Sequence, residues 1–137
     1  MAIEEAREAI GKHVCDKRQH VDETSKQYPR VDFSGLKNKE DVLWTPTHEA
    51  YDAMALRANA LVRLLQAFAK DKKASGSGST VHVACVSHSC FLFAIFNCAL
   101  RCTHVDQGKK DDRDLSSWFQ TGELRSVALR FLDDFIQ

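Results

Sequence analysis

Apolar and polar residues repeat with two different periods along the chain, and these periods predict both helices and strands. Between residues 47 and 69 apolar side chains recur every three or four positions, which predicts one long amphipathic helix. Residues 81–86 are mostly apolar and predict a buried strand, followed at once by a buried helix over 89–100. Residues 124–132 alternate apolar with polar and predict a second strand. The expected apolar stripe of the long helix is Ala53, Leu56, Ala60, Leu61, Leu64, Leu65 and Phe68, and the core candidates of the next helix are Phe91, Leu92, Ile95, Phe96 and Leu100.

The remaining segments predict short or irregular structure. Residues 3–10 fit a short helix that Gly11 would end, and residues 12–46 show little periodicity. Residues 74–79 form a flexible Gly/Ser connector, and residues 107–114 form a charged loop. The order helix, strand, helix, strand predicts an α/β fold in a single domain over residues 1–137. Two strands are too few for an independent parallel sheet with covered faces.

Composition narrows the class of protein. Nineteen basic residues balance nineteen acidic ones, so we expect neither a nucleic acid nor a membrane surface as partner. The five cysteines are odd in number and scattered, which is typical of reduced thiols. The acidic start is unlike a signal peptide, and the longest apolar run is about half of a membrane span. We therefore expect a soluble, cytoplasmic protein.

The most informative motif is Ser-His-Ser at positions 87–89, where the predicted strand gives way to a helix. Free backbone N–H groups and the helix dipole favour an anion there, and the imidazole of His88 adds a donor. The position also lies beyond the carboxyl end of a strand, where α/β proteins place ligands. We expect a phosphate site at His88, with Ser87 and Ser89 as hydroxyl or backbone donors or as caps of the helix. The alternative is a buried histidine that caps its own helix.

Four segments carry a family resemblance. Val-Ser-His-Ser-Cys-Phe-Leu at 86–92 resembles the second-histidine motif of the histidine phosphatase superfamily, the phosphoglycerate-mutase-like proteins. Gly11 with Cys-Asp-Lys-Arg at 15–18 is similar to a segment of plant, fungal and protist members. The pieces at 28–34, 40–44 and 48–49 resemble the next segments of those members, and Gly-Glu-Leu-Arg-Ser at 122–126 looks like their closing segment. The resemblance covers essentially the whole chain.

The resemblance implies a three-layer fold with a short sheet flanked by helices, and phosphoryl transfer through a phosphohistidine without metal or cofactor. It also exposes a gap, because the family's nucleophile lies in an Arg-His-Gly motif and this sequence contains none. We expect the chain to correspond to the C-terminal half to two-thirds of a histidine phosphatase, without the N-terminal strands. Nucleophilic catalysis needs an attacking atom next to the substrate, so we expect weak activity or none from this chain alone.

Each candidate residue receives a role from the resemblance. His88 would stabilise the phosphate, and Glu8 would be the general acid, although Arg7 could occupy that position instead. Lys17 and Arg18 would bind substrate carboxylate or phosphate, with a solvated basic turn as the alternative. Glu123 and Arg125 resemble family residues, but we expect a structural ion pair between them. The expected ligand is phosphate or a phosphorylated small molecule.

Other interpretations remain open. A non-catalytic pseudophosphatase would bind partners, because uncovered strand edges and apolar faces invite a homo-oligomer or a complementing chain. Cys85 and Cys90 flank His88 and suggest a Cys–His nucleophile, although buried thiols of this kind are usually structural. Cys98, Cys102 and His104 have metal-like residue types but lack an obvious fourth ligand.

Overall fold

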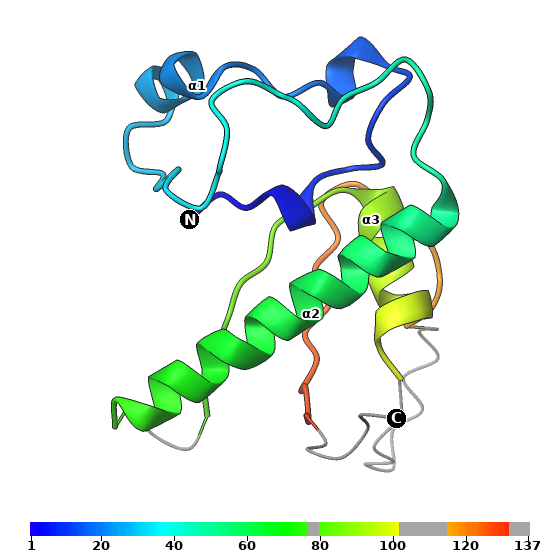
Figure 1. Ribbon diagram of the computed structural model, residues 1–137. Coiled ribbons are helices and arrows are strands. Elements are labelled where there is room, and N and C mark those ends of the chain that lie inside the picture. The colour runs from blue at the N-terminus through cyan, green and yellow to red at the C-terminus, as the bar shows by residue number, and fades with distance from the viewer. Residues whose placement is uncertain (77–79, 102–114, 132–137) are drawn as a thin grey trace.

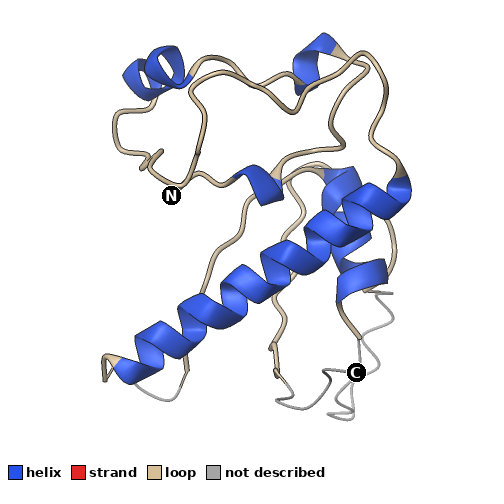
Figure 2. Ribbon diagram, in the orientation of Figure 1, coloured by secondary structure: helices blue, strands red, loops and turns tan. Residues whose placement is uncertain are grey.

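The computed structural model describes residues 1–76, 80–101 and 115–131, and the elements of these residues are all helical (Figures 1 and 2). The first fifty residues form an irregular layer that lies above the remaining helices in Figure 1. The elements in chain order are the 3-10 helices η1 (Glu4–Ala6) and η2 (Val14–Asp16), the helices α1 (Val21–Gln27), α2 (Tyr51–Ala74) and α3 (Ser89–Ala94), and the π-helix η3 (Ile95–Ala99).

Helix α2 confirms the long amphipathic helix, shifted toward the C-terminus relative to the predicted range of 47–69. Its buried residues are Met54, Ala58 and Leu61, which follow one another at intervals of four and three residues. The predicted stripe is wrong in part, because Leu56 is 73% exposed and Leu64 and Phe68 are also exposed. Only a narrow face of the helix packs against α3, η3 and η1, so part of its apolar surface remains open.

The core lies between α2 and the second half of the chain. Phe91, Ile95 and Phe96 are buried, as the sequence predicts, while Leu92 and Leu100 pack against the core from its edge. The ring of Phe119 completes the core at 5.3 Å from the ring of Phe96. The predicted helix over 89–100 exists but ends in a π turn, since the N–H of Leu100 donates to the carbonyl of Ile95 at 3.1 Å.

The predicted α/β class is wrong for the described residues, because neither 81–86 nor 124–131 forms a strand. Both segments run behind α2 in Figure 1, and no backbone–backbone hydrogen bond joins them to each other or to other described residues. Val86 and Leu124 are 90% and 85% exposed. A strand requires a neighbouring strand to accept and donate its backbone hydrogen bonds, and the described part of the chain supplies none.

The predicted helix over 3–10 is also wrong beyond one turn, since only η1 forms there. Side chains from outside this segment instead hold it through hydrogen bonds to its backbone. No helix in the three described ranges is long and apolar enough to cross a membrane. Part of the connector at 74–79 and the charged loop at 107–114 lie outside the described residues.

Candidate functional site

His88 is the residue that immediately precedes α3, and its backbone is extended with φ −111° and ψ 160°. Its carbonyl accepts the N–H of Leu92 at 2.9 Å, which is the first hydrogen bond of the helix. The side chain is exposed and makes no capping hydrogen bond. The alternative of a buried, capping histidine is therefore wrong, and the ring is open to solvent.

Glu8 meets the same end of α3 from a distant part of the sequence. Its Oε1 accepts the N–H of Phe91 at 3.1 Å and the N–H of Ala9 at 2.9 Å. The hydroxyl of Ser87 donates to the carbonyl of Ala6 at 2.6 Å, so a second bond joins the two segments. A carboxylate in the first turn of a helix is favoured by the free N–H groups there. The structure thus brings Glu8 and the Ser-His-Ser motif together.

The two serines of the motif differ in what they offer. Ser87 already donates its hydroxyl proton to Ala6, which leaves only oxygen lone pairs for another group. Ser89 is the first residue of α3 and is half-buried. Of the two predicted donors, Ser89 is the one whose hydroxyl proton is not engaged by another described residue.

The guanidinium of Arg7 forms ion pairs and hydrogen bonds within the N-terminal layer and makes none to α3 among the described residues. Its guanidinium donates to both carboxylate oxygens of Asp41 at 2.9 and 2.6 Å, to Glu4 at 3.1 Å and to the carbonyl of Asp16 at 2.9 Å. Burial opposes the charge of Asp41, but the hydrogen bonds from Arg7 and from the N–H groups of Arg18 and Leu43 outweigh it and lower the pKa of Asp41. Of the two candidates for the acid position, only Glu8 reaches α3.

Lys17 and Arg18 follow η2 directly, and their side chains contact other residues of the N-terminal layer. The guanidinium of Arg18 donates to the carbonyls of Asn38, Lys39 and Glu40 at 2.8 to 2.9 Å and pairs with Glu4 at 3.0 Å. The exposed Lys17 places its Nζ 5.4 Å from the ring centre of Trp44. No hydrogen bond or ion pair among the described residues connects either side chain to His88.

Arg57 and Glu49 form a largely buried ion pair that the sequence analysis did not predict. The two side chains are each 11% exposed and meet through two bonds of 3.0 and 2.6 Å. Burial opposes the charge of Glu49, but hydrogen bonds from Arg57 and from the N–H of Ile10 lower the pKa of Glu49. Glu49 and Arg57 also line a shallow open hollow with Ile10 and His48. Glu49 and Arg57 are eight residues apart, and this spacing alone does not predict a contact between them. Arg57 also binds backbone carbonyls of another segment, which the sequence does not indicate.

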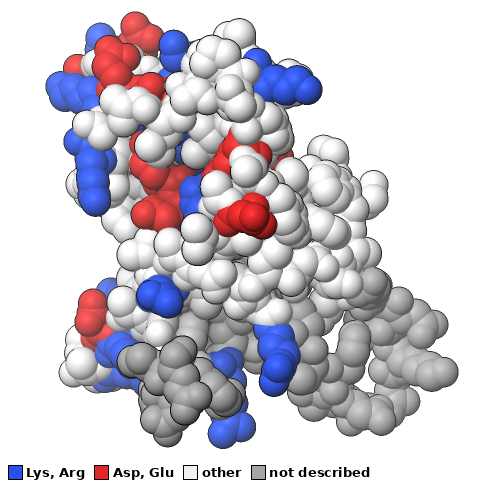
Figure 3. Space-filling model, turned by 45° about the vertical axis from the view of Figure 1, so that its right-hand side comes forward, with Lys and Arg blue, Asp and Glu red and all other residues white. Residues whose placement is uncertain are grey.

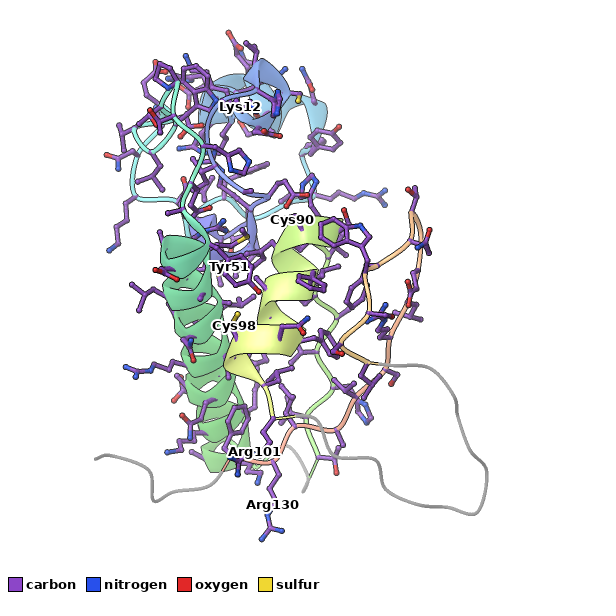
Figure 4. All side chains as sticks on the ribbon, turned by 90° about the vertical axis from the view of Figure 1, so that its right-hand side faces the viewer. Lys12, Tyr51, Cys90, Cys98, Arg101 and Arg130 are labelled. Carbon is purple, nitrogen blue, oxygen red and sulfur yellow. The ribbon has the colours of Figure 1, made fainter. Side chains whose placement is uncertain are left out.

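The cysteine alternatives gain no support. Cys90 lies in α3 with its sulfur 3.9 Å from that of Met54, and Figure 4 shows it near the start of the helix. Burial, and then the nearby charges of Glu8 and Glu49, raise the pKa of Cys90, which disfavours the reactive thiolate. Cys98 contacts the hydroxyl of Tyr51 at 3.2 Å, whereas Cys102 and His104 lie outside the described residues.

Glu123 and Arg125 form the predicted ion pair at 2.6 Å. Arg125 also donates to the carbonyls of Leu115 and Ser117 at 2.7 and 2.9 Å, and its guanidinium lies 3.6 Å from the ring centre of Phe119. The pair therefore fastens a loop to the core and does not brace a strand.

Comparison with known proteins shows which proteins the sequence is similar to. The chain resembles the phosphoglycerate-mutase-like proteins of the histidine phosphatase superfamily, and three curated relatives confirm that resemblance. It is 32% identical over 130 residues to a phosphoglycerate mutase-like protein of Arabidopsis thaliana, which covers 94% of this chain and 43% of the relative. It is 31% identical over 127 residues to phosphoglycerate mutase-like protein 1 of the same plant, covering 92% and 40%.

The chain therefore spans less than half the length of these two relatives. No family model and no solved structure matches it.

Proposed function

We propose that this chain is a phosphoglycerate-mutase-like module with a residual phosphate-binding site at His88 and little phosphoryl transfer of its own. The observation that carries the proposal is the exposed ring of His88 directly before α3, with the carboxylate of Glu8 hydrogen-bonded to the N–H of Phe91. An imidazole N–H can donate to a phosphate oxygen, and a neighbouring carboxyl group can give a proton to a leaving oxygen.

Charge explains why binding would be weak. The carboxylate of Glu8 repels an approaching phosphate, so binding favours the protonated form of Glu8, which is the form that a general acid needs. The guanidinium groups that could offset this repulsion, those of Arg7, Arg18 and Arg57, are paired with carboxylates and carbonyls. On the face shown in Figure 3, acidic and basic side chains are interspersed over the upper half of the molecule.

Turnover would be weaker still, because the 137-residue sequence contains no Arg-His-Gly. His88 and Glu8 would hold a phosphate and a proton, but neither supplies the attacking atom of a phosphohistidine mechanism. A covalent mechanism needs an attacking atom next to the phosphorus, so little turnover is expected by this route.

Thermal unfolding in inorganic phosphate tests the binding site. Wild-type protein should gain stability with increasing phosphate, and His88→Ala should lose that gain while His82→Ala, an exposed histidine of the preceding segment, keeps it. Glu8→Gln removes the like charge and should tighten phosphate binding by a factor on the order of ten. Equal stabilisation of wild type and His88→Ala would refute the site.

Hydrolysis of p-nitrophenyl phosphate tests the catalytic part of the proposal. Turnover by wild-type protein should stay close to that of a buffer blank. Robust turnover that disappears in His88→Ala would show a working phosphatase and contradict the proposed impairment.

A second candidate function is a non-catalytic interaction module, and the exposed apolar surface favours it. Leu56 on α2, Val86 and Leu124 are 73%, 90% and 85% exposed, and the two extended segments leave backbone groups unpaired within the described residues. Such surfaces bind a second copy or a strand from another chain. Light scattering at increasing concentration should show a mass above that of the monomer, and a constant monomer mass would contradict self-association.

A further inference from the structure

The side chain of Arg57 reaches from α2 to the segment that carries Glu8. Its Nη1 donates to the carbonyls of Glu5 and Arg7 at 3.0 and 2.7 Å, and its Nη2 donates to the carbonyl of Glu8 at 2.9 Å. The remaining donors bind Glu49. All five N–H groups of the guanidinium are therefore used, and three of them fix the backbone of residues 5–8.

The same guanidinium also contacts the residue that receives the Glu8 carboxylate. Its central carbon lies 4.3 Å from the ring centre of Phe91, a fully buried side chain of α3. The N–H of Phe91 is the donor to Glu8 Oε1. Arg57 thus touches both sides of the Glu8–Phe91 hydrogen bond, the backbone of one residue and the ring of the other.

We propose that Arg57 is a positioning residue, which holds the Glu8 carboxylate at the start of α3, the helix that His88 immediately precedes. This inference rests on the proposed role of Glu8 at the phosphate site. A planar fork of five donors can bind three carbonyls and a carboxylate together, whereas the single nitrogen of a lysine cannot. Glu49 balances the charge of Arg57 and, through the N–H of Ile10, anchors the end of the same segment.

The amide resonance of Phe91 offers a direct measurement of this role. In wild-type protein its chemical shift should follow the titration of Glu8, and Glu8→Gln should abolish that response, which assigns it. Arg57→Lys keeps a positive charge for Glu49 but gives up most of the carbonyl bonds. We expect it to remove more than half of the pH-dependent shift at Phe91. The matched control is Arg63→Lys, an exposed arginine of the same helix, which should leave the shift unchanged.

A folded Arg57→Lys protein with an unchanged Phe91 response overturns the inference, and so does an Arg57→Lys chain that does not fold, because Arg57 would then serve general stability. Glu49→Gln should retain the Phe91 response, and its loss there would assign the positioning to the ion pair. None of these measurements uses phosphate, so a failure of phosphate binding at His88 would be seen separately.

Discussion

Gly11 shows how one residue determines the path of the chain within the N-terminal layer. Its φ is +93°, and a Cβ atom there would collide with the carbonyl of Thr47 and lie 2.7 Å from that of Thr45. Gly11→Ala should destabilise the protein by about 1–3 kcal/mol or more, because the backbone conformation and the contact both oppose a side chain. Urea unfolding measures the loss.

The control for Gly11 is Gly122→Ala, where φ is +75° but no atom lies within 4 Å of the added Cβ. Both variants carry the conformational cost, so the difference between them reports the close approach to Thr45 and Thr47. A Gly122→Ala protein as unstable as Gly11→Ala would contradict this explanation.

Asp41 is the residue on which the N-terminal layer depends. Its carboxylate is fully buried and accepts from Arg7 and from the N–H groups of Arg18, Leu43 and Trp44. Asp41→Asn leaves Arg7 with a poor partner and should cost about 3–5 kcal/mol in the free energy of unfolding. Asp22→Asn, which breaks an exposed pair with Lys39, should cost about 0–1 kcal/mol.

The sequence indicates candidate site residues but not the contacts that they make. The Ser-His-Ser motif predicts a phosphate site at His88, which stays a prediction. The resemblance placed the family's acid position at Glu8 or Arg7, and of these two the structure brings Glu8 to α3. It could not assign Arg7 to Asp41 or Arg57 to Glu49, because such pairs depend on segments that meet only after folding.

At the scale of elements, the apolar periodicity predicted helix α2 correctly but not which of its faces is buried. Apolar spacing identifies the helix, but two adjacent apolar faces satisfy the same spacing, and packing against α3 selects the face of Met54, Ala58 and Leu61. Leu61→Ala should therefore cost about 2–5 kcal/mol. Leu56→Ala, the same change on the exposed face, should stay within about 0.5 kcal/mol. Urea unfolding of both variants tests the assignment, and equal losses would contradict it.

The extended segments at 81–86 and 124–131 show that a strand-like sequence pattern does not by itself produce a strand. Alternation at residues 124–131 is compatible with a strand, yet alternation places side chains only on two faces and supplies no hydrogen-bonding neighbour. The described residues offer no such neighbour, and both segments remain without backbone pairing and largely exposed. A sequence pattern thus predicts which segments can pair, whereas the presence of a partner decides whether they do.

At the scale of the whole molecule, the Arg7–Asp41 pair lies within the N-terminal layer and the Arg57–Glu49 pair joins this layer to α2, and both pairs make stability dependent on pH. The pKa values of Asp41 and Glu49 are lower in the folded protein than in the unfolded chain. At acid pH the unfolded chain therefore binds more protons than the folded one. Stability from these groups is present above about pH 4, where the unfolded carboxyls are ionised, and it is lost as the pH falls toward the folded pKa values.

The melting temperature should accordingly fall as the pH is lowered from about 5 to about 3, because in this range the unfolded chain takes up protons at Asp41 and Glu49 more readily than the folded protein does. The double variant Asp41→Asn, Glu49→Gln should be less stable at neutral pH but should lose less of its stability on acidification. A wild-type melting temperature that is as flat as that of the double variant would mean that these pairs do not control the stability of the protein.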